Sequence, residues 1–167
     1  MTLLLHTSTP AAYLGLVVEG RFLARDEFLF DPRFSEQLAE RIRGFLKTHH
    51  SKLRTLTKIV IHAGPASANL PVRQAGASAG RPGGFTGLRI GVTTANTLAY
   101  ALGIPVIGVR GDISGLDELL QRSAGLPPTK ENLVVPAYGR EPALGPLPFV
   151  RTSCRHSSDR SSTFIDT

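Results

Sequence analysis

The amino-acid sequence predicts an α/β domain with a mixed sheet, in which a three-strand meander is followed by alternating helices and strands. Three observations support this prediction. The first 28 residues contain three short apolar runs separated by turn residues, and an amphipathic helix and a continuous apolar strand follow them. A glycine-rich turn, an apolar helix and a second buried strand then occupy residues 83–109. Strands that alternate with helices after a meander indicate a sheet of mixed direction with helices packed against it.

Three strands are expected at the start of the chain. Residues 2–6 form a short apolar run, which the turn residues of 7–10 interrupt. Residues 12–19 and 22–28 are the second and third strands. Between them, Gly20 and Arg21 are typical of a tight reversal, so the two strands should form a hairpin.

An amphipathic helix is expected from Asp31 to about His49. Asp31 can cap free N–H groups, and the fixed φ of Pro32 suits the first helical position. Apolar residues recur at helical spacing and should face the sheet: Phe34, Leu38, Ile42, Phe45 and Leu46. Residues 56–63 then read as a strand that is apolar throughout, as a parallel strand covered on both faces would be.

A long loop and a glycine turn come next. Ala, Ser, Gly and Pro dominate residues 65–84 without any period, which predicts a loop. The turn that leads into the following helix comprises Gly83, Gly84, Phe85, Thr86 and Gly87, with Arg89 one turn further on. Thr86 can accept from the first free N–H groups of the helix. At its other end, Gly103 suits the left-handed position that closes a helix, and Pro105 cannot continue it.

The helix of residues 87–102 has two faces. Its broad apolar face should pack on the sheet; it consists of Leu88, Gly91, Val92, Ala95, Leu98, Ala99 and Leu102. A second stripe of small or mildly apolar groups lets another helix approach closely; it consists of Ile90, Thr94, Thr97 and Ala101. A helix of the same chain and a helix of a partner both fit this stripe. Arg89, Asn96 and Tyr100 fill the polar sector between the faces.

The remaining elements are shorter. Residues 106–109 predict a buried strand, residues 114–124 a short helix, and residues 133–135 a final strand. Residues 1–142 should therefore form one domain. Residues 143–167, rich in Ser, Arg and Thr, predict a disordered tail.

Composition limits the class of protein. A formal net charge of +6 and an isoelectric point near 10.1 favour an acidic partner, either RNA or an acidic protein face. The single cysteine, Cys154, excludes an internal disulfide and fits a reducing compartment. Neither a signal peptide nor an apolar run of membrane-spanning length occurs, so we expect a cytoplasmic protein without membrane contact.

Three blocks of sequence resemble the amino-terminal half of the actin-like ATPase superfamily, which has a ribonuclease H-like fold. They are the strand and turn of residues 3–10, the strand of residues 59–65, and residues 85–91 with the helix after them up to Pro105. More narrowly, they resemble the Gcp-like, or glycoprotease-like, family of tRNA threonylcarbamoyladenosine biosynthesis proteins. The third block is the most specific, because several residue types recur in order.

The resemblance implies a non-catalytic scaffold subunit without a cofactor. Its partner would be a TsaD-like catalytic subunit, which modifies tRNA next to the anticodon, with a TsaE-like ATPase as a further component and tRNA reached through the complex. The helices of residues 31–49 and 87–102 would form the contact surface, or pair two copies of the chain as a homodimer. The implied interface residues are Phe34, Leu38, Ile42, Ile90, Thr94, Thr97 and Ala101.

Two departures from the family pattern bear on catalysis. The motif Gly-Pro-Gly-Ser-Phe-Thr-Gly is split by the loop of residues 65–84. His6 stands where the superfamily has a carboxylate that positions metal and phosphates. The alternative function, a small nucleotide-binding kinase or hydrolase of the superfamily, would need that carboxylate. The glycine turn and Arg89 could hold a phosphate, although no P-loop lysine follows.

No metal site is expected from the sequence. The histidines are His6, His49, His50, His62 and His156, and no two of them are one helical turn apart. Cys154 and His156 offer only two ligands in a flexible tail. A third hypothesis is direct RNA binding through the arginines of the loop and tail.

Overall fold

Five strands form one mixed sheet in the order β3-β2-β1-β4-β5. The computed structural model describes residues 1–9, 11–29, 33–64, 85–129 and 133–138, so the predicted loop and tail lie outside the described residues. The strands are β1 (Thr2–His6), β2 (Ala11–Val18), β3 (Arg21–Leu29), β4 (Lys58–Gly64) and β5 (Val106–Arg110). β1, β2 and β3 are antiparallel neighbours, whereas β1, β4 and β5 are parallel. The predicted meander and mixed sheet are confirmed.

The β2–β3 hairpin turns at Glu19 and Gly20, whose φ angles are 49° and 78°. Two consecutive positive φ values are the geometry of the two-residue hairpin turn that matches the twist of the strands. Leu16 pairs with Ala24 and Val17 with Phe22, so Leu23 is an extra residue, a bulge in edge strand β3. A bulge at a sheet edge hinders pairing with another chain.

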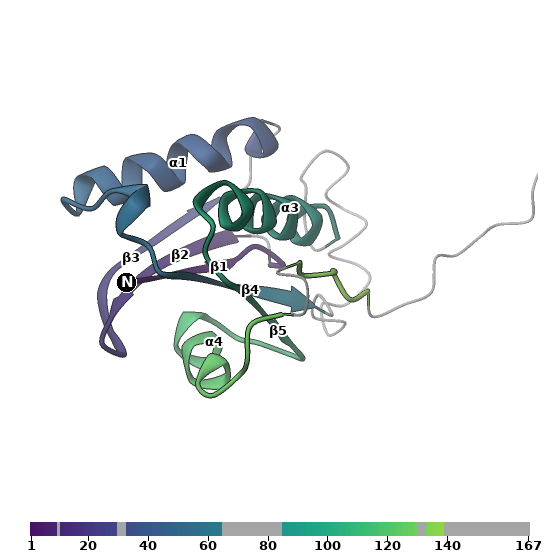
Figure 1. Ribbon diagram of the computed structural model, residues 1–167. Helices are drawn as coiled ribbons and strands as arrows, with labels where there is room; N and C mark the ends of the chain where they lie inside the picture. The colour runs from purple at the N-terminus through teal and green to yellow at the C-terminus, as the bar shows by residue number, and fades with distance from the viewer. Residues whose placement is uncertain (10, 30–32, 65–84, 130–132, 139–167) are drawn as a thin grey trace, which may run out of the picture.

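Helices cover both faces of the sheet. α1 (Phe34–Thr48) and α3 (Phe85–Leu102) lie side by side on one face, and α4 (Leu116–Ser123) lies on the other, as Figure 1 shows. A short 3-10 helix, η1 (Leu53–Thr55), connects α1 to β4. The larger core lies under α1 and α3, and the smaller one lies between the sheet and α4. None of the described helices is long and apolar enough to cross a membrane.

The start of α1 differs from the prediction. The helix begins at Phe34 with Arg33 as its N-cap residue, and no side chain caps it there. Asp31, the predicted N-cap residue, and Pro32 lie outside the described residues. The observed N-cap residue, Arg33, comes two residues after Asp31. The apolar face is confirmed, because Phe34, Leu38, Ile42, Phe45 and Leu46 are all buried.

The two ends of α3 also allow a comparison with the prediction. The helix begins at Phe85, so Thr86 lies inside its first turn and is not the N-cap. At the other end, Gly103 has the predicted left-handed conformation, with φ of 64°. The N–H of Ile104 donates to the carbonyl of Ala99 at 3.0 Å, which closes the helix in the expected way.

The predicted strand at residues 133–135 is wrong. The segment 133–138 is not a strand and forms no β-ladder. The Asn96 side chain donates to the carbonyl of Val134 and accepts from its N–H, each at 2.9 Å. The N–H of Ala137 donates to the carbonyl of Ala63 at 2.6 Å. A side-chain amide therefore takes the place of a strand ladder for this segment.

Candidate functional site

A close contact at Gly91 positions α3 on the sheet. A Cβ at Gly91 would lie 1.9 Å from Oγ1 of Thr7, the residue that follows β1, so only glycine fits here. Gly87, Ala95 and Ala99 are the other small residues of the buried face. Small side chains let α3 lie close to the sheet, and its opposite face is turned toward solvent and toward α1.

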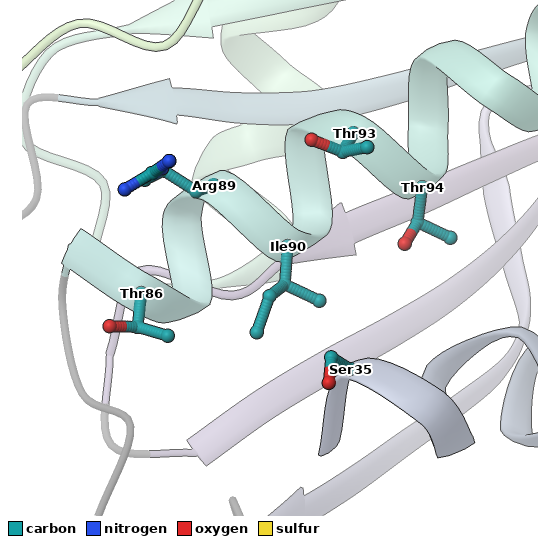
Figure 2. A pocket seen from close by; sticks show the side chains of 6 residues that line it. All are labelled: Ser35, Thr86, Arg89, Ile90, Thr93 and Thr94. Atoms are coloured by element: carbon teal, nitrogen blue, oxygen red, sulfur yellow. The ribbon is translucent and has the colours of Figure 1, made fainter. Parts of the chain in front are cut away.

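An open groove of about 350 Å³ lies between the first turn of α1 and the first half of α3. Figure 2 shows its six lining residues, which are Ser35, Thr86, Arg89, Ile90, Thr93 and Thr94. Ser35 comes from α1, and the other five come from α3. Hydroxyl groups, one isoleucine and one guanidinium group therefore form a shallow, largely uncharged surface with a single cation.

The predicted second stripe of α3 lies along this groove and beyond it. Ile90 and Thr94 are half-buried, whereas Thr97 and Ala101 are exposed. The Thr97 hydroxyl donates to the Thr93 carbonyl at 2.8 Å. Its hydroxyl is thus satisfied within the helix, and small side chains remain accessible along the stripe although α1 of the same chain packs beside it.

The three α1 residues of the predicted interface do not line the groove. Phe34, Leu38 and Ile42 are 2%, 0% and 0% exposed, because they pack against the sheet. A partner could reach them only by displacing α1. Ser35, Thr86 and Thr93 line the groove, yet sequence reasoning did not include them among the interface residues. Only the arrangement of α1 beside α3 brings Ser35 to the threonines.

A buried histidine pair occupies the carboxyl ends of β1 and β4. The rings of His6 and His62 stack, with centroids 4.9 Å apart and planes 8° apart. The Nε2–H of His6 donates to the Ile113 carbonyl at 3.1 Å, and that of His62 donates to the Gly111 carbonyl at 2.8 Å. Both imidazoles thus hold the loop that leads from β5 to α4.

The hydrogen bonds define the roles of the ring nitrogens. Because each Nε2 faces a carbonyl, each carries the proton, and Nδ1 of each neutral ring is an acceptor. The Ser8 hydroxyl donates to Nδ1 of His62 at 2.5 Å. Nδ1 of His6 and Oγ1 of Thr7 have no hydrogen-bond partner among the described residues. This cluster was not predicted from the sequence, because only the parallel pairing of β1 and β4 brings the two histidines together.

Burial keeps both histidines neutral. Desolvation, together with the smaller effect of the neighbouring His62, lowers the pKa of His6 from 6.5 to about 4. Desolvation also lowers the pKa of His62. The position at which the resemblance implies a carboxylate is therefore filled by an uncharged ring that is already bonded to the protein. An uncharged ring of this kind lacks the negative charge that holds a metal near phosphates.

The glycine turn is described only in part. Gly83 and Gly84 lie outside the described residues. Phe85 stacks on Tyr138 with a centroid distance of 5.6 Å, and Gly87 is buried. Thr86 and Arg89 are among the residues that line the groove of Figure 2. Within the described ranges, no three His, Cys, Asp or Glu side chains are placed to hold a metal ion.

The sheet order and the helices on both faces define an actin-like, or ribonuclease H-like, ATPase fold. YeaZ from Pseudomonas aeruginosa has this fold and is 28% identical to the chain, with a TM-score of 0.50; the match covers 65% of this chain and 43% of YeaZ. A second Pseudomonas aeruginosa structure, of an uncharacterized protein with similarity to peptidase YEAZ, matches equally in identity and TM-score and is covered to 42%.

Two sequence comparisons agree with the structural ones. Residues 74–111, which include α3 and β5, match the family described as TsaD, tRNA N6-adenosine threonylcarbamoyltransferase. An uncharacterized protein of Mycobacterium leprae is 34% identical over 126 residues, which are 75% of this chain and 30% of that protein. The chain is thus similar to YeaZ in structure and to the TsaD family in the sequence of residues 74–111. It spans less than half the length of the relatives that it matches.

Proposed function

We propose that this chain is a non-catalytic subunit that binds a TsaD-like threonylcarbamoyltransferase through the face of α3 beside α1, and that it thereby takes part in tRNA modification next to the anticodon. The observation that carries the proposal is the accessible stripe of α3 in a YeaZ-like fold. The stripe consists of Ile90, Thr94, Thr97 and Ala101, and the groove with its small side chains adjoins it.

The geometry of the stripe suits a helix as the partner element. Helices pack with their axes about 8–10 Å apart, and small side chains at the contact permit the shorter distances. The half-buried Ile90 and Thr94 form the floor of such a contact, and the exposed Thr97 and Ala101 continue it by two turns. A helix of the catalytic subunit laid along α3 would bury all four side chains.

The buried histidine pair supports a role without catalysis. The alternative, a nucleotide-binding kinase or hydrolase, needs a negative group at the end of β1. That position holds His6, which is 0% exposed and bonded to Ile113. No observation on the described residues favours the alternative, and measurable binding of ATP or ADP to the isolated protein would support it.

Other partners belong to the same proposal. tRNA is reached through the complex, and a TsaE-like ATPase is its third component. Without the catalytic subunit, the same face of α3 can pair with a second copy around a two-fold axis.

A binding titration with an arginine inserted into the stripe tests the proposal. Thr94→Arg and Ala101→Arg each place a cation where the partner helix would lie, and burying an unpaired charge there should weaken binding about 100-fold or more. Gln121→Arg is the matched control, because it adds the same side chain to the exposed face of α4 on the other side of the sheet. Unchanged binding by folded Thr94→Arg and Ala101→Arg would show that the partner uses another surface.

A further inference from the structure

The groove of Figure 2 contains a positive charge that no acidic residue among its described lining residues matches. Arg89 is exposed and is the charged residue among the six that line the groove. None of these lining residues is acidic, and the sequence of α3 contains no Asp or Glu. Glu36, the exposed neighbour of Ser35 in α1, does not line the groove.

The environment of Arg89 adds to this positive potential. Arg89 lies in the second turn of α3, near the helix end that carries the positive pole of the helix dipole. Its neighbours in the groove, Thr86 and Thr93, are neutral and short, so they neither compensate the guanidinium charge nor cover it. A carboxylate that enters the groove would meet one cation and no competing anion among the lining residues.

We propose that the helix of the catalytic subunit that lies on α3 carries a carboxylate, which enters the groove and pairs with Arg89. This inference rests on the proposed function and specifies the chemistry of the partner at that site. A guanidinium group binds a carboxylate through two parallel hydrogen bonds and so fixes its orientation as well as its distance. The stripe beyond Ile90 supplies apolar contact, while the Arg89 pair sets the register of the partner helix along α3.

The register follows from helix geometry. A partner carboxylate held at Arg89 places the residues about five and eight positions further along a partner helix of the same direction beside Thr94 and Thr97, because both helices rise about 1.5 Å per residue. Those partner residues must be small or aliphatic, since the stripe offers no other charge. The predicted partner element is thus a helix with one acidic residue followed at helical spacing by small residues.

Charge reversal at Arg89 tests the inference. The affinity of the wild-type protein for the TsaD-like subunit of the same organism is measured by titration at 50 and 300 mM NaCl, next to Arg89→Glu, Arg89→Gln and Arg89→Lys. Breaking a desolvated ion pair at an interface should weaken binding by Arg89→Glu about 30-fold or more. Arg89→Gln should lose much of the salt dependence, and Arg89→Lys should fall between them because it lacks the planar fork.

The control is Arg54→Glu, which reverses an exposed charge in η1, beyond the carboxyl end of α1. Its affinity should stay within about two-fold of the wild type, since an exposed charge at a distance is screened. If the wild type binds and Arg89→Glu binds with the same affinity, the inference is overturned and the proposed function remains intact. Absence of wild-type binding would overturn both. A homodimer that Arg89→Glu dissociates, without an effect on the catalytic subunit, would assign the groove to a second copy and also overturn the inference.

Discussion

Acid should destabilise this protein through His6. The side chain is 0% exposed, it stacks on His62, and its Nδ1 has no partner among the described residues that could accept a proton from it. A proton on Nδ1 would therefore create a buried cation against a second buried imidazole. The charged groups nearest to the pair are Asp112, Glu118 and Arg122, which belong to α4 and the loop before it.

The magnitude follows from the pKa of His6. Folding lowers this pKa from 6.5 to about 4. Each pKa unit is worth about 1.4 kcal/mol, so the difference corresponds to about 3 kcal/mol. Because the folded pKa is depressed, the unfolded chain binds more protons between pH 4 and 6.5. The contribution of His6 to the free energy of unfolding should be constant above pH 7, fall as the pH drops from 6.5 to 4, and level off below. His62 acts in the same direction.

Urea unfolding at pH 7.5, 6, 5 and 4 measures this loss. His6→Gln keeps an N–H that can reach the Ile113 carbonyl and removes the titrating group, so its free energy of unfolding should depend less on pH, by about 3 kcal/mol over this range. His49→Gln, at the half-buried end of α1, is the matched control and should keep the wild-type profile. An equal loss of stability in wild type and His6→Gln between pH 6.5 and 4 would show that His6 does not cause the loss of stability in acid.

Two further predictions concern the position of α3. Gly91→Ala places a methyl group against Thr7 Oγ1, so it should destabilise the fold by about 1–3 kcal/mol in thermal unfolding, whereas Gly44→Ala in the open middle of α1 should stabilise it by about 0.5–1 kcal/mol. Equal effects at both glycines would contradict the close contact. Asn96→Leu removes both hydrogen bonds to Val134, so hydrogen exchange in the segment 133–138 should accelerate while the strands keep their protection.

Much of the fold could be predicted because local patterns and tertiary structure agree. The short turn between two apolar runs predicted the hairpin, and Gly103 before Ile104-Pro105 predicted the end of α3. The apolar period of residues 34–46 gave the buried face of α1. In each case the local structure depends on side chains and backbone angles within a few residues of one another, so it can be predicted without knowledge of distant contacts.

The errors arose where distant contacts decide. Residues 133–135 have the composition of a strand, but the amide of Asn96 binds the backbone there and no strand forms. Phe34, Leu38 and Ile42 were predicted for two roles, core and interface; their burial confirms the first, and the second stays a prediction. The histidine pair depends on the register of β1 against β4, which a single sequence does not determine.

The proposed function requires that this chain bind a TsaD-like catalytic subunit. Size-exclusion chromatography with light scattering, on the chain alone and mixed with the TsaD-like subunit of the same organism, tests it most directly. A stable heterodimer with the mass of one copy of each chain should form in the mixture at micromolar concentration. Separate elution of the two proteins at that concentration, with unchanged masses, would contradict it.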